Sequence, residues 1–290
     1  MPPQTRELRS AHDVPVTVHR WDPAGPPRGI VQLAHGMGEH LLRYEALAAE
    51  LTDAGFVVVG QDHRGHGATA GDGAWGHLGP GGWDELVRDI GRVSDRVRAE
   101  FPELPLVLLG HSMGSFAAQQ FVLDASRDLA GLVLTGTSTL DLLEPAMDFD
   151  GPTDLSAFNA PFAPARTDHD WLSRDEAQVD AYVADPRCGF GLSAADSRQM
   201  FASARQLADP ERLGVVRADL PVYIAVGDAD PVNGQMALVH ALVQRLQGAG
   251  LDDVTLTAYE GARHEVFNET NRAEVVADLL GWLDRVVPRR

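Results

Sequence analysis

Residues 105–125 read PLVLLGHSMGSFAAQQFVLDA and carry the clearest structural signal in the chain. An apolar run of strand length, 105–109, leads into Gly110-His111-Ser112-Met113-Gly114, and a helical pattern follows over 115–125. A serine between two glycines at a tight strand-to-helix turn projects above the edge of a sheet, at the positive end of the helix dipole. The stretch therefore predicts that Ser112 is an exposed nucleophile.

Further apolar runs of strand length lie on both sides of this stretch, each bounded by glycine or polar residues. Most are rich in Val, Ile and Leu at successive positions, which is typical of strands covered on both faces. Helical patterns lie between them, over 86–97, 238–246 and Glu269–Val287. This alternation predicts a mostly parallel sheet flanked by helices, with 14–21 as an antiparallel edge strand. The other predicted strands are Ile30–Ala34, Phe56–Val59, Leu106–Leu109, Leu132–Leu134, Val222–Val226 and Val254–Tyr259.

One segment interrupts the alternation of strands and helices. Residues 141–206 contain many Asp, Pro and Phe residues and short helical patches, but no apolar run of strand length. Excursions of this length are uncommon in compact domains unless they are functional. We therefore expect residues 1–140 and 207–290 to form the core, and 141–206, the cap segment, to be a helical insertion that covers the active face.

A second glycine-rich turn follows the predicted strand Ile30–Ala34. It reads His35-Gly36-Met37-Gly38, and its glycines allow the backbone to approach a ligand closely. A serine nucleophile needs two backbone N–H groups aimed at the oxygen that becomes negatively charged. We expect the N–H groups of Met37 and Met113 to form this oxyanion hole.

A serine hydroxyl also needs a base and an acid that orients the base. His264 follows the last predicted strand, and the order Ser, acid, His along the chain makes it the expected base. The acid should follow the strand Val222–Val226, where the loop offers both Asp228 and Asp230. Position along the chain does not separate these two, and Asp141 is a more distant third candidate.

At these motifs the chain resembles the monoacylglycerol lipase and lysophospholipase branch of the α/β-hydrolases, a serine aminopeptidase S33-like family. The matching segments are HGMGEH (35–40), DHRGHG (62–67), GHSMG (110–114), GDADPV (227–232) and RHE (263–265). The resemblance implies an α/β-hydrolase fold and selects Asp230, which precedes a proline, as the acid. It also implies a carboxylic ester hydrolase that works through an acyl-enzyme on substrates such as a monoacylglycerol, without a cofactor.

Two alternatives remain open at this stage. The same three residues could serve an amidase, aminopeptidase, thioesterase or perhydrolase. The chain could also be a ligand-binding pseudoenzyme that keeps the pocket without useful turnover.

Asp62, His63 and His66 crowd one loop and His35 and His40 another, but a complete serine triad would make a metal redundant, so we expect no metal ligands there. Aromatic residues of the cap segment could line an acyl pocket or form a small core of their own: Phe158, Phe162 and Trp171, with Phe149 and Phe190.

Composition limits the partners that the chain can have. Its 290 residues carry a formal charge of −18, which repels nucleic acid and anionic lipid, so we expect a small-molecule ester as the partner. The single cysteine, Cys188, cannot form an intrachain disulfide and is expected to be a packed cap residue. The first fifteen residues are too polar for a secretory signal, and no apolar run is long enough for stable membrane insertion. These features favour a cytoplasmic protein and leave its oligomeric state open.

Overall fold

A single eight-stranded sheet forms the centre of the molecule in the computed structural model, which describes residues 2–71 and 73–289. The strand order is β1-β2-β4-β3-β5-β6-β7-β8. β2 is antiparallel to β1 and β4, whereas all the other neighbouring pairs are parallel. The predicted α/β fold is therefore confirmed. The strands are β1 (Gln4–Arg9), β2 (Pro15–Trp21), β3 (Gly29–Ala34), β4 (Phe56–Gln61), β5 (Leu106–His111), β6 (Gly131–Thr135), β7 (Val222–Gly227) and β8 (Val254–Tyr259).

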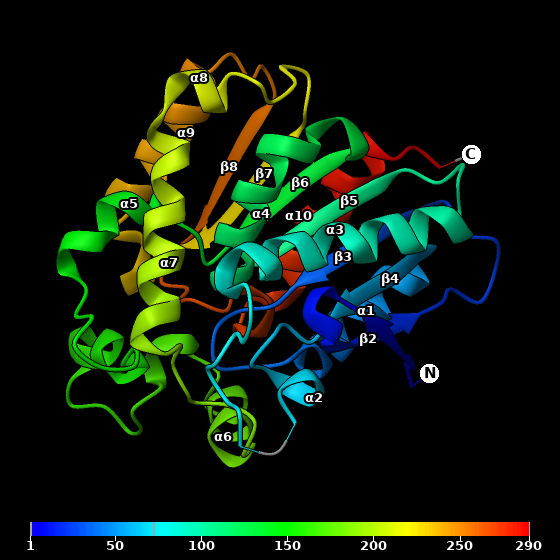
Figure 1. The fold of residues 1–290 in the computed structure, drawn as a ribbon. Helices are drawn as coiled ribbons and strands as arrows, with labels where there is room; N and C mark the ends of the chain where they lie inside the picture. Colours follow the sequence, from blue (N-terminus) through cyan, green and yellow to red (C-terminus); the bar gives the residue numbers. More distant parts are fainter. Residues whose placement is uncertain (1, 72, 290) are drawn as a thin grey trace.

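Helices cover both faces of the sheet (Figure 1). The strands of the centre are apolar at successive positions because both of their faces pack against helices. α1 and α10 pack on one face around Val31, Leu109 and Leu279, and α3, α4 and α9 pack on the other around Ile30, Leu108 and Leu242. The helices are α1 (Glu45–Asp53), α2 (Gly67–Ala70), α3 (Gly82–Glu100), α4 (Met113–Ala125), α5 (Leu140–Leu143), α6 (Glu176–Ala184), α7 (Ala194–Ala204), α8 (Pro210–Leu213), α9 (Ala237–Gly248) and α10 (Arg272–Val286).

The N-terminal edge of the sheet differs from the sequence prediction. β2 was expected at the edge, but it pairs with β4 on one side and with β1 on the other. β1 reads QTRELR, and five of its six residues are exposed. An edge strand with charged, exposed side chains carries no apolar run and blocks pairing with other chains. Hydrophobic patterning could therefore not reveal β1.

The chain between β6 and β7 contains α5, α6, α7, α8 and several 3₁₀ turns, among them Leu155–Phe162 and Asp170–Leu172. This segment packs on the core through α7, which contacts α3 and α4. Figure 1 shows α5 and α7 next to each other at the end of the sheet away from both termini, with α6 lower in the view. The carboxyl ends of the parallel strands lie at that end of the sheet, where α/β folds place their ligands.

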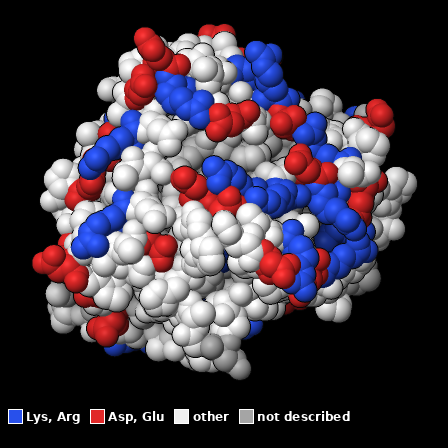
Figure 2. Space-filling model, in the orientation of Figure 1, with Lys and Arg blue, Asp and Glu red and all other residues white. Residues whose placement is uncertain are grey.

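Figure 2 shows basic side chains gathered in a band from the centre to the right of the view, with acidic side chains beside them. The chain has no lysine, so its 24 basic residues are all arginines. Arginines on α3 pair with neighbouring carboxylates, as in Arg88 with Glu85 and Arg92 with both Glu85 and Asp89. Within 2–71 and 73–289, no helix combines the length and the apolar character needed to cross a bilayer.

Candidate active site

Ser112 lies at the turn between β5 and α4. Its backbone has φ 51° and ψ −122°, a combination of angles that residues other than glycine rarely adopt. The turn is held because the N–H of Ser112 donates to Thr135 O at 2.9 Å, and the N–H groups of Ser115 and Phe116 in α4 donate to Ser112 O. A Cβ at Gly114 would collide with Ala34 O, so only glycine lets α4 pass this close to β3. The strained turn fixes the position of the serine side chain.

The predicted oxyanion loop lies directly against this serine. A Cβ built on Gly36 would come within 3.2 Å of Ser112 Cβ, so the absence of a side chain at Gly36 leaves room beside the hydroxyl. Met37 and Met113 both line the pocket at this point. Among the described residues, neither of their backbone N–H groups has a hydrogen-bond acceptor. Two residues with unpaired backbone donors therefore line the same pocket as Ser112.

His264 follows β8, and its Nδ1 lies 2.9 Å from Oδ2 of Asp230. Both side chains are buried, with 2% and 0% of their surface exposed. Burial acts to lower the pKa of His264, but the charge and hydrogen bond of Asp230, helped by Glu265 and Glu39, outweigh it and raise the pKa above its usual value. His264 and Ser112 line the same pocket without a direct hydrogen bond, which often forms only when substrate is bound.

The structure separates the two candidate acids. Asp228 is exposed, and its carboxylate accepts the N–H of Gly261 at 2.7 Å, so it stabilises the loop turn. Asp230 is buried, and its Oδ1 accepts the N–H of Val232 while Oδ2 faces His264. Asp141, the third candidate, forms a bidentate ion pair with Arg245. Only Asp230 of these three contacts the histidine.

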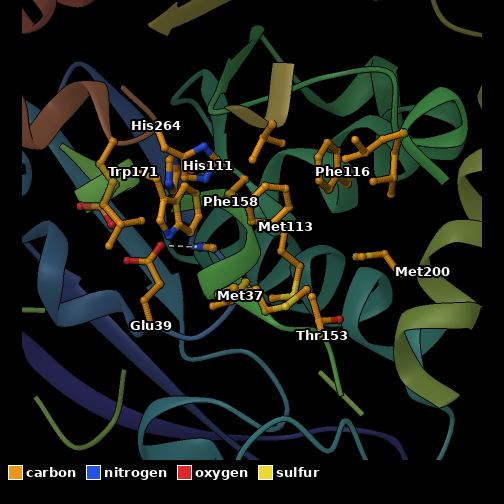
Figure 3. A pocket seen from close by; sticks show the side chains of 18 of the residues that line it. Met37, Glu39, His111, Met113, Phe116, Thr153, Phe158, Trp171, Met200 and His264 are labelled. Carbon is orange, nitrogen blue, oxygen red and sulfur yellow. Dashed lines mark hydrogen bonds between the residues drawn. The ribbon is translucent and has the colours of Figure 1, made fainter. Parts of the chain in front are cut away.

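A buried ion network connects the oxyanion loop with the histidine loop. The carboxylate of Glu39 accepts the N–H of Gly36 at 2.6 Å, a contact drawn as a dashed line in Figure 3. Arg43 donates to Glu39 at 2.7 Å and also to both carboxylate oxygens of Glu265, at 2.6 and 2.8 Å. Tyr44 Oη also donates to Glu39. Sequence reasoning missed this network, although Glu39 and Glu265 lie inside the quoted HGMGEH and RHE motifs.

A pocket of about 610 Å³, its open mouth included, contains these groups. Figure 3 shows His264, His111 and Trp171 on one side of it, with Met200 and Thr153 on the opposite side. Its walls are mostly apolar, and several of them come from 140–201. The apolar lining residues are Met37, Met113, Phe116, Leu140, Leu143, Met147, Leu155, Phe158, Trp171, Leu172, Met200, Phe201 and Val232.

The aromatic residues singled out in the sequence fall into two groups. Phe158 and Trp171 line the pocket, and the Trp171 ring lies 4.7 Å from that of His264. Phe162 lies outside the lining and packs under the guanidinium of Arg263 at 4.3 Å. Phe149 packs on Phe201, and Phe190 contacts His66 and Trp75.

The histidines that suggested a metal site are all buried, and those at 35, 63 and 66 are hydrogen-bonded within or between their two loops. Nε2 of His35 accepts the N–H of His63 at 2.9 Å, and Nδ1 of His66 donates to Arg64 O at 2.8 Å. Burial lowers the pKa of His63 to about 3 and that of His66 to about 4. His111, beside Ser112, is also kept neutral, because burial and the neighbouring His264 lower its pKa to about 4.

The sheet order and the serine turn define the chain as an α/β-hydrolase. Residues 25–271 match the family described as serine aminopeptidase, S33, and the chain belongs to this family. It is 33% identical over 273 residues to a monoacylglycerol lipase of Mycolicibacterium smegmatis, covering 91% of this chain and 90% of that one. It is 31% identical to the monoglyceride lipase of Homo sapiens, covering 86% and 79%.

A solved structure gives the same result. The carboxyl esterase from Bacillus coagulans, in complex with glycerol, superposes with a TM-score of 0.85 at 30% identity, over 99% of both chains. These similarities confirm the predicted class: the chain is a serine ester hydrolase of the monoacylglycerol lipase type.

Proposed function

We propose that Ser112, His264 and Asp230 form a catalytic triad that hydrolyses neutral acyl esters with a medium-length acyl chain, such as monoacylglycerols. The Nδ1 of His264 faces Asp230 at 2.9 Å, which leaves Nε2 directed at the pocket that Ser112 lines. This arrangement at the strained turn of Ser112 is the observation that carries the proposal. The names of the two relatives, monoacylglycerol lipase and monoglyceride lipase, supply the substrate class.

In the first half-reaction, Ser112 Oγ attacks the ester carbonyl carbon while Nε2 of His264 takes the hydroxyl proton. The carbonyl oxygen becomes an oxyanion, which the unpaired N–H groups of Met37 and Met113 stabilise. Asp230 holds the ring in the correct tautomer and stabilises the imidazolium. The carbon–oxygen bond to the alcohol then breaks, and His264 returns the proton to the departing alcohol oxygen.

In the second half-reaction, water replaces the alcohol. His264 removes a proton from the water, whose oxygen attacks the acyl-enzyme carbonyl, and the same two N–H groups stabilise the second oxyanion. The bond between the carbonyl carbon and Ser112 Oγ breaks, and His264 returns the proton to the serine. Every proton is transferred through one imidazole, so this chemistry uses only groups of the chain and water.

Residues 141–206 act as the cap in this proposal. Two of its backbone carbonyls, those of Trp171 and Leu172, accept the N–H groups of His264 and Glu265, at 3.4 and 2.8 Å. The cap segment also supplies Met147, Phe158 and Met200, among other residues, to the apolar wall. An acyl chain that packs against this wall is removed from water, which contributes about 0.8 kcal/mol of binding free energy per buried CH₂ group.

A fluorophosphonate probe with a fluorescent tag tests the nucleophile. We expect the probe to label the wild-type protein and to leave Ser112→Ala unlabelled, with the fold intact in both. Ser156→Ala, on a 3₁₀ turn of the cap, is the matched control and should label normally. Steady-state turnover of a monoacylglycerol by Ser112→Ala should fall by about 10⁴-fold or more. Undiminished labelling of Ser112→Ala would refute the assignment.

An aminopeptidase is the second candidate, because the matched family carries that description. Such an enzyme must bind a protonated amine, and Glu39 and Glu265 are carboxylates that line the pocket. Both are already paired with Arg43, which leaves no free anionic partner for an amine among them. We therefore expect esters to be cleaved faster than matched amides and aminoacyl amides. A panel of acyl esters, amides and thioesters with one acyl group decides between the two.

A further inference from the structure

His40, Asp185 and Cys188 converge at the boundary between the core and the cap segment. His40 follows the oxyanion loop, and the other two lie in the loop after α6. Nε2 of His40 is 2.9 Å from Oδ2 of Asp185, and one donor atom from each of the three residues lies within 4.8 Å of the others. No other group of three such donors this close occurs within 2–71 and 73–289.

The surroundings of these three residues suit a cation. His40 is only 2% exposed, and its Nε2 faces Asp185, whereas Nδ1, the other ring nitrogen, is buried without a hydrogen-bond partner. Three carboxylates lie nearby, those of Asp185, Glu39 and Glu265, against two guanidinium groups. Arg187 donates to both oxygens of Asp185, and Arg43 pairs with the other two, so the carboxylates outnumber the guanidinium groups by one before any ionisation of the thiol.

We propose that His40, Asp185 and Cys188 bind a zinc ion. The donor set of an imidazole nitrogen, a carboxylate oxygen and a sulfur matches the preference of Zn²⁺, whereas Mg²⁺ and Ca²⁺ prefer oxygen alone. On binding, the S–H bond of Cys188 breaks, a Zn–S bond forms, and the proton passes to solvent. Three protein ligands leave the fourth tetrahedral position to water. This proposal departs from the sequence analysis, which expected no metal ligand at His40. The ion itself takes no part in ester hydrolysis.

A bound ion would tether the cap segment to the oxyanion loop. Gly38 O already accepts two hydrogen bonds from this part of the cap, from Gly189 N–H at 3.0 Å and from Tyr182 Oη at 2.8 Å. Gly38 follows Met37 directly, and His40 lies two residues further on. Zinc would therefore stabilise the native arrangement of both loops and raise the melting temperature of the protein.

Cobalt(II) in place of zinc gives a direct test, because a thiolate ligand produces an intense near-ultraviolet charge-transfer absorption. Cys188 is the only cysteine, so this absorption can come from no other residue. We expect it in the wild-type protein and not in Cys188→Ser. Zinc affinity, measured by calorimetry, should fall at least about 10-fold in Asp185→Asn and in His40→Gln. Even the loss of a residue that only hydrogen-bonds to a metal ligand lowers metal affinity by about this factor. His240→Gln, at an exposed histidine, should bind zinc like the wild type.

Two results would overturn the site. The first is a folded wild-type protein that shows no thiolate absorption with excess cobalt(II). The second is zinc affinity that stays within about twofold of the wild type in both Cys188→Ser and Asp185→Asn, which would place the ion elsewhere. The melting temperatures of the metal-free variants show which of them fold. If His40→Gln does not fold, the comparison of Cys188→Ser with the wild type still tests the site, because this variant replaces a single atom. Zinc should raise the melting temperature of the wild type but not that of Cys188→Ser.

Discussion

Arg43 binds both carboxylate oxygens of Glu265, with hydrogen bonds of 2.6 and 2.8 Å. The same guanidinium donates to Glu39, whose other oxygen holds the N–H of Gly36. Gly36 lies beside Ser112, and Glu265 directly follows His264. One buried cation therefore links the loop that carries the proposed oxyanion donor to the loop that carries the proposed base.

Removing this cation should destabilise the protein strongly. In Arg43→Gln, two buried carboxylates lose their shared partner, and a broken buried pair typically costs about 3–5 kcal/mol of unfolding free energy. Arg43→Lys keeps the charge but not the bidentate geometry, so it should lose less stability while its kcat still falls. Urea unfolding and steady-state kinetics measure both effects. Arg285→Gln, at an exposed ion pair with Asp253, is the control and should change little. Wild-type stability in Arg43→Gln would contradict the role of the network.

The two aspartates of the loop after β7 should differ sharply on substitution. Asp230→Asn keeps the shape of the side chain but favours the wrong imidazole tautomer, so kcat should fall by about 10⁴-fold. Asp228→Asn removes one hydrogen bond to a turn and should retain most of the activity. Kinetics of the two purified variants on one ester provide the comparison. Equal losses at the two positions would remove Asp230 from the proposed triad.

Much of the fold was predictable because its strands are buried on both faces. β8 begins and ends at the residues expected, and the other predicted strands of the centre differ from the observed ones by at most two residues at either end. β1 was missed because its side chains are polar and exposed. The predicted start of the last helix was too early: α10 begins at Arg272 rather than at 269, because residues 269–271 form a turn before it.

The site was predictable only where the chemistry is local. Ser112 and the glycine turns carry short motifs, so the sequence shows them directly. The choice between Asp228 and Asp230 depends on which carboxylate faces His264, a distance across two loops that the sequence does not contain. Pocket residues such as Met147 and Met200 carry no motif, since any apolar side chain of suitable size can form a wall.

The rate of ester hydrolysis should fall on the acidic side of a midpoint above pH 6.5. Only neutral His264 can accept the serine proton, and Asp230 raises the pKa of this imidazole above its usual 6.5 despite burial. The protonated, inactive form therefore persists to higher pH than for a free histidine. A profile of kcat/KM against pH with an uncharged ester measures the midpoint. Asp230→Asn should move it to lower pH, and a flat profile down to pH 5 would argue against His264 as the base.

Acyl-chain selectivity should depend on the wall opposite His264. Met200 lies on that side of the pocket (Figure 3), and Met200→Trp should shorten the space for the chain. We expect kcat/KM to fall at least about 10-fold for long-chain esters and to change little for acetyl esters, because a pocket discriminates by about 1–3 kcal/mol per methylene group. Val183→Trp, at an exposed position of α6, is the matched control. A uniform loss over all chain lengths would show that Met200 does not set the length.

Stability should decrease as pH falls below about 6.5, because His63, His66 and His111 are buried in their neutral forms. Burial lowers the pKa values of His63, His66 and His111 to about 3, 4 and 4. The unfolded chain, with ordinary pKa values near 6.5, then binds more protons than the native state, so the stabilisation present above pH 6.5 is lost on acidification.

His264 has a raised pKa and acts in the opposite direction, but only above pH 6.5, where its contribution is lost as pH rises. Each buried neutral histidine thus contributes a slope of up to about 1.4 kcal/mol per pH unit between pH 6.5 and its native pKa. Urea unfolding at pH 7.5, 6.0 and 5.0 measures the sum. Residue 66 cannot titrate in His66→Gln, so the slope of its unfolding free energy against pH should be smaller than that of the wild type by the contribution of about one proton. If His66→Gln and the wild type showed equal slopes, His66 would not be buried in its neutral form.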